Sequence, residues 1–201
     1  MNLVVRRFLR NTEILKGFDI DPDQVRKDAK EMEAVFYRIC PDQVDIGEKS
    51  PTTFNWVVSR TSDATGVRSP REIIHLLNTL KSEQLKRYEN GIPPPTDERL
   101  FERATFKEAL PEVSTVRLEQ TLYAEYPEKK KYIEALRENK TDQSSDSLSA
   151  IWGIDIADAH VVAEELVLAG FFEKRRDGDS HRYWVPFLYR DALRLSQGAA
   201  G

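Results

Sequence analysis

Arg71 stands where a guanidinium could meet a phosphate group. The residues before and after it carry the signature of a helix start, because Ser69 can act as the N-cap, Pro70 costs no hydrogen bond at the first helical position, and Glu72 can complete a capping box. Arg71 would then lie in the first turn, beside the positive end of the helix dipole. Helix N-termini bind anions, and arginine offers paired donors to phosphate oxygens. Arg71 is therefore our candidate phosphate-binding residue.

A second group of basic residues surrounds a predicted hairpin near the C-terminal end. Two β-prone runs, Phe171–Lys174 and Arg182–Val185, flank the turn sequence Asp177–Ser180. Their cations could contact the phosphates of a nucleic acid, or they could simply form a solvated hairpin tip. The candidate nucleic-acid-binding residues are Lys174, Arg175, Arg176 and Arg182.

Other chemistry finds little support in the sequence. His75, His160 and His181 are scattered, without the spacing of a metal site, and Cys40 is the only cysteine. Cys40 ends an apolar helical stretch, so we expect a buried, inert thiol. No G-x-x-x-x-G-K-[ST] stretch is present to cradle nucleotide phosphates. We therefore predict no catalytic residue and no metal site in this chain, which by itself would not be an enzyme.

Composition narrows the class of protein further. The 201 residues carry a formal net charge of −4, which argues against a chain whose main task is to coat nucleic acid. No apolar run approaches the roughly 20 residues that cross a bilayer, so we expect no membrane partner. The first ten residues carry three arginines and do not resemble a secretory signal. These features together predict a cytoplasmic protein.

The pattern of apolar residues and helix-start signals predicts a mainly α-helical fold. Residues 1–91 indicate a small helical subdomain, with helices over 3–16, from Asp21 to Cys40, from Ser50 and from Ser69 to Asn90. Residues 92–111 would be a proline-rich linker and a connecting helix, with a helix break at Pro111.

Residues 112–201 indicate a winged helix-turn-helix domain. We expect a polar loop over Thr141–Ser147, a short helix closed by Gly153, a longer helix over Ile156–Ala169 stopped by Gly170, and a β-hairpin wing. The longer helix would be the DNA-reading element of such a module. Its polar positions include acidic residues that repel phosphates, so protein contacts or weak DNA binding led by the wing are favoured.

Several stretches resemble the C-terminal region of a bacterial family of AAA-type P-loop ATPases. The stretches that resemble its helical lid are Pro41–Asp45, Thr53–Trp56, Ser59–Thr61 and Ser69–Asn78. The stretches that resemble the winged helix closing those proteins are Gly170–Phe172 and Tyr183–Leu193. The resemblance covers most of the chain.

The resemblance implies a role for Arg71. In AAA-type ATPases an arginine called sensor 2, at the N-terminus of a lid helix, contacts the terminal phosphates of the nucleotide and couples nucleotide state to lid position. That role would fall on Arg71, while Arg60 and Arg68 would be interdomain salt-bridge partners. Since the chain lacks the phosphate-binding loop, ATP and magnesium would require an ATPase core, supplied upstream or by a partner chain.

Two functions therefore stand against each other. The first is the regulatory lid and winged helix of an AAA-type ATPase. The alternative is a stand-alone winged-helix module that binds DNA or another protein.

Overall fold

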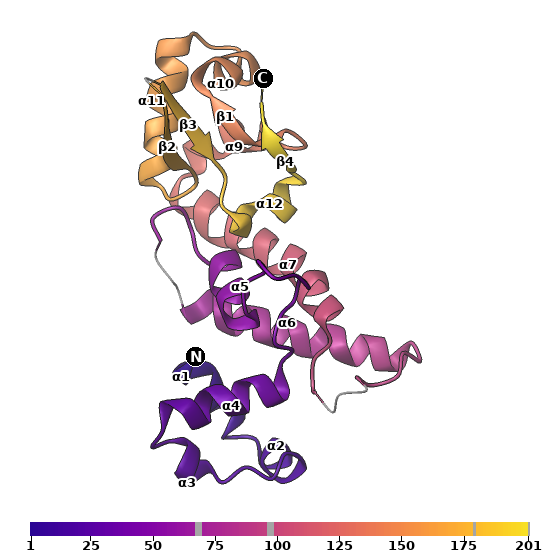
Figure 1. Cartoon of the computed structure of the whole chain (residues 1–201). Coiled ribbons are helices and arrows are strands. Elements are labelled where there is room, and N and C mark those ends of the chain that lie inside the picture. Colours follow the sequence, from indigo (N-terminus) through magenta and orange to yellow (C-terminus); the bar gives the residue numbers. More distant parts are fainter. Residues whose placement is uncertain (67–69, 96–98, 179, 201) are drawn as a thin grey trace. The chain divides into compact units, whose positions relative to one another are not determined.

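A computed structural model describes residues 1–66, 70–95, 99–178 and 180–200 (Figure 1). The predicted N-cap Ser69 and the candidate salt-bridge residue Arg68 lie outside these residues. The chain is mainly helical and carries one four-stranded sheet. It forms two compact units: unit 1 comprises Met1–Val57 and Ile73–Ala109, and unit 2 comprises Val58–Glu72 and Leu110–Gly201. The borders of these units differ from the predicted borders at 91/92 and 111/112, and the predicted domains stay a prediction.

Unit 1 contains several short helices whose N-cap is an asparagine or an aspartate. The predicted helix over 3–16 is two helices, because the Asn11 side chain accepts hydrogen bonds from the N–H groups of Glu13 and Ile14. The predicted helix from Asp21 is likewise interrupted, since Asp28 caps a new helix through the N–H of Lys30. Such side chains compete with the helical backbone, so they favour helix starts over helix interiors. The resulting helices are α1 (Asn2–Phe8), α2 (Thr12–Gly17), α3 (Pro22–Val25) and α4 (Ala29–Ile39).

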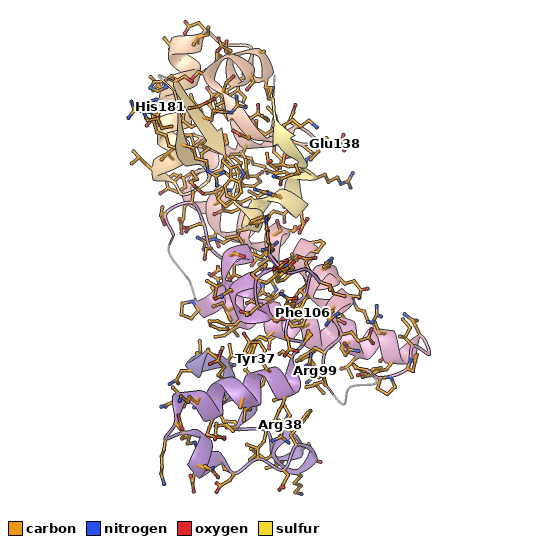
Figure 2. The ribbon with its side chains drawn as sticks, in the orientation of Figure 1. Tyr37, Arg38, Arg99, Phe106, Glu138 and His181 are labelled. Carbon is orange, nitrogen blue, oxygen red and sulfur yellow. The ribbon has the colours of Figure 1, made fainter. Side chains whose placement is uncertain are left out.

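The core of unit 1 gathers around Phe106, which is fully buried (Figure 2). Its ring packs edge-on against Trp56 and Phe101, with centroids 6.1 and 6.3 Å away. The other helices that contribute to unit 1 are α5 (Thr53–Arg60), α6 (Pro70–Glu89) and α7 (Arg103–Arg117). Cys40 is completely buried, and this burial raises the pKa of its thiol. The expectation of a buried thiol is confirmed, and its inertness stays a prediction.

A buried amide fixes the C-terminal half of α6 within unit 1. Gln84 is 3% exposed, and its Oε1 accepts a 2.8 Å hydrogen bond from the Thr105 hydroxyl and a 3.0 Å bond from the Glu102 N–H. Arg87, one turn further along α6, forms a 2.7 Å ion pair with Glu102. Helix α6 is therefore held to the start of α7 by directional contacts as well as by apolar packing.

Helix α7 runs through Pro111, so the predicted break at this residue is wrong. Proline removes one backbone hydrogen bond from a helix interior and usually kinks it. Here Pro111 is exposed, while Ala109 and Val113 on either side are almost completely buried. The burial of the apolar face on both sides of the proline outweighs the lost hydrogen bond.

After α7, unit 2 alternates short helices with strands. A π-helical turn, Leu118–Leu122, leads through α8 (Tyr123–Glu125) and a 3₁₀ turn (Pro127–Lys129) into α9 (Lys130–Glu134). The chain then forms β1 (Lys140–Ser144), α10 (Ser145–Trp152) and α11 (Ile156–Leu168). The C-terminal elements are β2 (Glu173–Asp177), β3 (Ser180–Trp184), α12 (Phe187–Leu193) and β4 (Ser196–Ala199).

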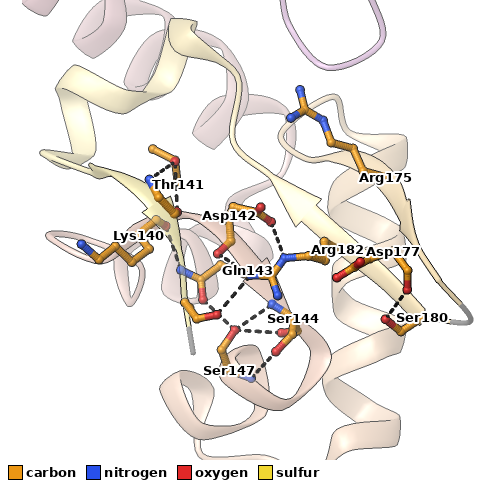
Figure 3. A network of polar contacts seen from close by, with 12 residues as sticks. Lys140, Thr141, Asp142, Gln143, Ser144, Ser147, Arg175, Asp177, Ser180 and Arg182 are labelled. Carbon is orange, nitrogen blue, oxygen red and sulfur yellow. Dashed lines mark hydrogen bonds and ion pairs between the residues drawn. The ribbon is translucent and has the colours of Figure 1, made fainter.

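The sheet has the strand order β2-β3-β1-β4. Strands β2 and β3 form the predicted hairpin, β3 pairs antiparallel with β1, and β4 lies parallel to β1. The predicted loop over Thr141–Ser147 is therefore wrong, because its first half is β1 and its second half begins α10. The side chains of Thr141 and Gln143 point to the buried face, whereas Asp142 pairs with Arg182 of β3 (Figure 3).

An aromatic cluster forms the core of unit 2. Phe171 and Phe172 are fully buried after α11, and they contact Tyr189 of α12 and Tyr183 of β3 with ring centroids 5.5 and 5.6 Å apart. Gly170 directs the chain into this cluster with a φ of 77°, as expected from its helix-stopping position.

Within the described residues, no helix is long and apolar enough to cross a membrane.

Replacing Gly170 by alanine should destabilise the protein by about 2 kcal/mol. A positive φ costs a Cβ roughly 1–2 kcal/mol, and the added atom would also meet Thr65 Cγ2 at 3.3 Å. Gly153→Ala is the matched control, since Gly153 has a φ of 64° but open space around it. Urea unfolding should therefore give a larger loss for Gly170→Ala than for Gly153→Ala. Equal losses would show that the contact with Thr65 does not matter.

Candidate functional site

Arg71 lies in the first turn of α6, where its side chain is exposed. The next residue behaves differently: Glu72 is 4% exposed, and its Oε1 accepts a 3.2 Å hydrogen bond from Arg117 of α7. The sequence predicted a capping-box role for Glu72, but Ser69 is outside the described residues, so the contact with Arg117 is the one the structure supplies. The first turn of α6 therefore presents an arginine outward and buries a carboxylate.

Arg117 is the centre of a buried ionic cluster in unit 2. Besides Glu72, its guanidinium contacts Asp63 at 3.4 Å, and the three side chains are between 6% and 19% exposed. Burial disfavours the charged form of Arg117, but Tyr189 and the two carboxylates outweigh it, so the pKa of Arg117 is raised. Burial also raises the pKa of Tyr189 to about 12, against the opposing effect of Arg117. The cluster holds the start of α6 to α7 through the contacts of Arg117 with Glu72 and Asp63.

Hydrogen bonds also fix residues 63–65, in the loop before α6, within unit 2. The N–H of Ala64 donates a 2.9 Å hydrogen bond to the carbonyl of Gly170, and Asp63 accepts from the N–H and the hydroxyl of Thr65. Asp63 therefore serves both the loop and Arg117. These contacts join the loop to the end of α11 within unit 2.

The four basic residues of the predicted nucleic-acid site do not form one open surface. Lys174 makes a 2.8 Å ion pair with Glu164 of α11. Arg182 donates to Asp142 Oδ1 at 2.9 Å and to the carbonyls of Asp142 and Ala200 (Figure 3). Lys174 therefore joins the hairpin to α11, and Arg182 joins β3 to β1 and to Ala200 after β4.

Arg175 and Arg176 differ from these two residues. Arg175 forms a 2.9 Å ion pair with Glu173 and stacks over the ring of Trp184, 4.0 Å from its centroid. Arg176 is exposed and donates to the carbonyl of Gly178 in the turn. His181, opposite Arg176 in the hairpin, is also exposed (Figure 2). Arg175 and Arg176 of the predicted site are therefore exposed, with the neighbouring His181 beside them, whereas Arg182 is half-buried.

Helix α11 joins the hairpin through a buried hydroxyl. The Tyr183 hydroxyl of β3 donates a 2.8 Å hydrogen bond to Glu164, and Nδ1 of His160 lies 2.8 Å from the oxygen of that hydroxyl. Hydrogen bonds from Lys174 and Tyr183 outweigh the effect of burial and lower the pKa of Glu164. His160, which we set aside as a metal ligand, is thus part of the contact between α11 and β3. Over the described ranges, no group of three or more potential ligands could hold a metal ion.

Sequence reasoning missed a cluster of arginines and aromatic rings. Arg190 of α12 lies over the rings of Trp184 and Phe187, 4.2 and 4.0 Å from their centroids. Arg60 stacks over Phe187 at 4.2 Å. The spacing of three residues among Trp184, Phe187 and Arg190 was visible in the sequence, but nothing indicated that Arg60 joins them.

Comparison with protein-family models, with curated proteins and with solved structures finds no match to this chain.

Replacing Arg117 by methionine should lower the free energy of unfolding by about 3 kcal/mol, because two buried carboxylates would lose their partner. Neutralising these carboxylates as well, with Glu72→Gln and Asp63→Asn, should recover more than half of that loss. Arg103→Met on the exposed start of α7 is the control and should change stability by less than about 0.5 kcal/mol. A loss as small as the control would contradict the anchoring role of Arg117.

Proposed function

We propose that this chain is the C-terminal regulatory part of an AAA-type P-loop ATPase, in which α6 presents Arg71 to the nucleotide phosphates. The observation that carries the proposal is the contrast between two neighbouring residues. Arg71 is exposed in the first turn of a 20-residue helix, while Glu72 is buried against Arg117. An exposed arginine in this first turn could contact a phosphate brought by another protein segment, and the contact between Glu72 and Arg117 holds its helix in place.

Because the start of α6 is anchored, a nucleotide contact there could change the conformation of the elements attached to it. A phosphate contact at Arg71 would act on the first turn of α6, which Arg117 connects to α7 and the Asp63 loop connects to the end of α11. Loss of the phosphate would remove a charge-assisted contact from this turn. ATP and magnesium would be held by the ATPase core, and Arg71 would report whether the terminal phosphate is present.

The order of elements in unit 2 supports a winged helix as the second part of the proposal. The order is helix α9, strand β1, helices α10 and α11, and hairpin β2–β3. Strand β1 pairs with β3, so the three strands stand in the order β2-β3-β1 that this module uses. Helix α12 and strand β4 follow as additions.

A protein is the better partner for this winged helix than DNA. Asp155, the N-cap of α11, and Asp158 in its first turn are exposed, and their charges repel phosphates, while Glu165 forms an ion pair with Lys129. Two cations of the wing, Lys174 and Arg182, are already paired with carboxylates. The exposed surface of α11 also includes Val161 and Leu168, which are 56% and 82% exposed. Acidic and apolar side chains together suit a protein surface.

Arg71→Ala should lower ATP turnover at least about tenfold when the chain is assayed with the ATPase core that carries it, since one charge-assisted contact to the phosphates is lost. Arg71→Lys should recover part of the activity, because it keeps the charge but not the paired donors. Arg103→Ala, in the exposed first turn of α7, should leave turnover unchanged. Equal turnover and nucleotide affinity in Arg71→Ala and parent would reject the sensor role.

Duplex DNA should bind the chain weakly, with a dissociation constant no tighter than that of ordinary non-specific binding, about 10⁻⁴–10⁻⁶ M at physiological salt. Fluorescence anisotropy at two salt concentrations would measure it. The DNA-binding alternative would be supported by tighter binding that Arg176→Ala weakens, with the salt slope reduced by about one. Arg10→Ala, an exposed arginine of unit 1, is the control.

A further inference from the structure

Unit 1 contains a cavity that the proposed function does not use. Its volume of about 490 Å³ lies within the range of roughly 300–1,000 Å³ that is usual for small-molecule sites. The residues around it belong to unit 1 and come from α1, α2, α6 and the segment before α7. Apolar side chains from each of these elements form its walls, among them Phe8, Ile14, Leu77, Leu85 and Phe101. The cavity can therefore remove an apolar molecule, or the apolar part of one, from water.

Helix α6 forms one wall with a stripe of side chains that reaches from Ile74 to Tyr88. Leu77, Lys81 and Leu85 lie between these two residues at intervals of three or four positions, which places all five on one face of the helix. At a rise of about 1.5 Å per residue, the stripe is about 21 Å long. Leu85 remains 49% exposed in this wall. An elongated apolar wall with a half-exposed leucine suits an aliphatic chain better than a flat ring.

Two cations stand among these apolar residues. Arg7 lines the cavity from α1 and Lys81 from the middle of the α6 stripe, and both residues are exposed. In the part of the chain that the structure describes, neither of them forms an ion pair. Glu13 is the single acidic residue among the described residues that line the cavity. Two cations against one carboxylate give the lining a formal charge of +1.

A polar side chain without a protein partner lies beside Lys81. Asn78 lines the cavity three residues before Lys81, on the same face of α6, and within the described ranges its side-chain amide makes no hydrogen bond. The amide of Gln84, which also lines the cavity, is by contrast held by Glu102. A polar group of a ligand would therefore find its donors at Asn78 and Lys81, with apolar wall on both sides.

We propose that this cavity binds an aliphatic carboxylic acid of medium chain length, whose carboxylate contacts Arg7 and Lys81 and whose chain lies along the apolar residues of α6. A single carboxylate matches the formal charge of the lining, whereas a phosphate ester carries about −1.5 to −2. Lys81 stands midway along the stripe, so about 10 Å of wall extends from it in either direction, which limits the length of the chain. The Asn78 amide would donate a further hydrogen bond to the carboxylate. The proposal does not depend on the role given to Arg71.

The test is a titration of the whole chain with sodium octanoate at constant ionic strength, followed by the methyl NMR signals of Ile14, Ile74 and Leu85, which line the cavity. These signals should shift with saturation, at a dissociation constant of about 1 mM or tighter. Hexanoate should bind about tenfold more weakly, because two fewer methylene groups leave water. Octanol, which has the same chain and a neutral head, should bind at least about fivefold more weakly, because it makes no charge-assisted contact. Octyl phosphate distinguishes a carboxylate site from a phosphate site, and it should bind no tighter than octanoate.

Matched variants separate the two cations from general charge effects. Arg7→Met and Lys81→Met should each weaken octanoate binding at least about fivefold and change octanol binding less than about twofold. Arg6→Met is the control, since Arg6 is an exposed neighbour on α1 outside the lining, and it should leave both affinities unchanged. Leu85→Ser should weaken the binding of both ligands at least about threefold, because it removes part of the apolar wall. Far-UV circular dichroism would show that Leu85→Ser still folds, as expected of a half-exposed residue.

Several outcomes would overturn the proposal. One is a response to octanoate that never saturates, or an affinity for octanol equal to that for octanoate. Another is an equal loss of octanoate binding in Arg7→Met and Arg6→Met. Tighter binding of octyl phosphate than of octanoate would assign the cavity to a phosphate head group instead. Where a variant does not fold, the comparison of octanoate with octanol on the parent chain still decides.

Discussion

One buried guanidinium holds the start of α6 in place. Arg117 contacts Glu72 in the first turn of that helix and Asp63 in the loop before it, and its charge interacts with Tyr189 of α12. Helix ends fray when nothing fixes them. Here the first turn is tied to α7 through ion pairs that water screens less than it would at the surface, because all the partners are largely buried. The outward position of Arg71, and with it the proposed response to nucleotide, depends on this contact.

Local signals in the sequence predicted the elements that depend on neighbouring residues. The proline at the start of α6, the glycine after α11 and the turn between β2 and β3 each carry the backbone preference that the structure uses. The pattern of apolar residues and helix-start signals likewise predicted helices where α4 and α11 lie. Cys40 is buried as expected. The exposed position of Arg71 follows from the same reasoning, whereas its role stays a prediction.

Elements and sites that depend on distant residues were not predictable. Strand β1 has the sequence KTDQS, which reads as a loop, and it becomes a strand because β3 and β4 pair with it. In the sequence Glu72 looked like a capping residue, because nothing there indicates a contact with Arg117, which lies 45 positions away. The basic hairpin looked like one surface because the sequence does not reveal that Glu164 and Asp142 neutralise two of its cations. The stack of Arg60 on Phe187 was not predictable for the same reason, since the two residues lie far apart in the sequence.

The charges of β2 have a consequence beyond ligand binding. Every residue of this strand is charged, from Glu173 to Asp177, and the strand stands at the end of the sheet. The outermost strand of a sheet offers unpaired backbone groups to other chains, and charged side chains discourage such association. At the other end, β4 covers β1, whose sequence has no such protection. The charged residues of β2 can therefore serve to prevent association at this edge of the sheet, whatever the wing binds.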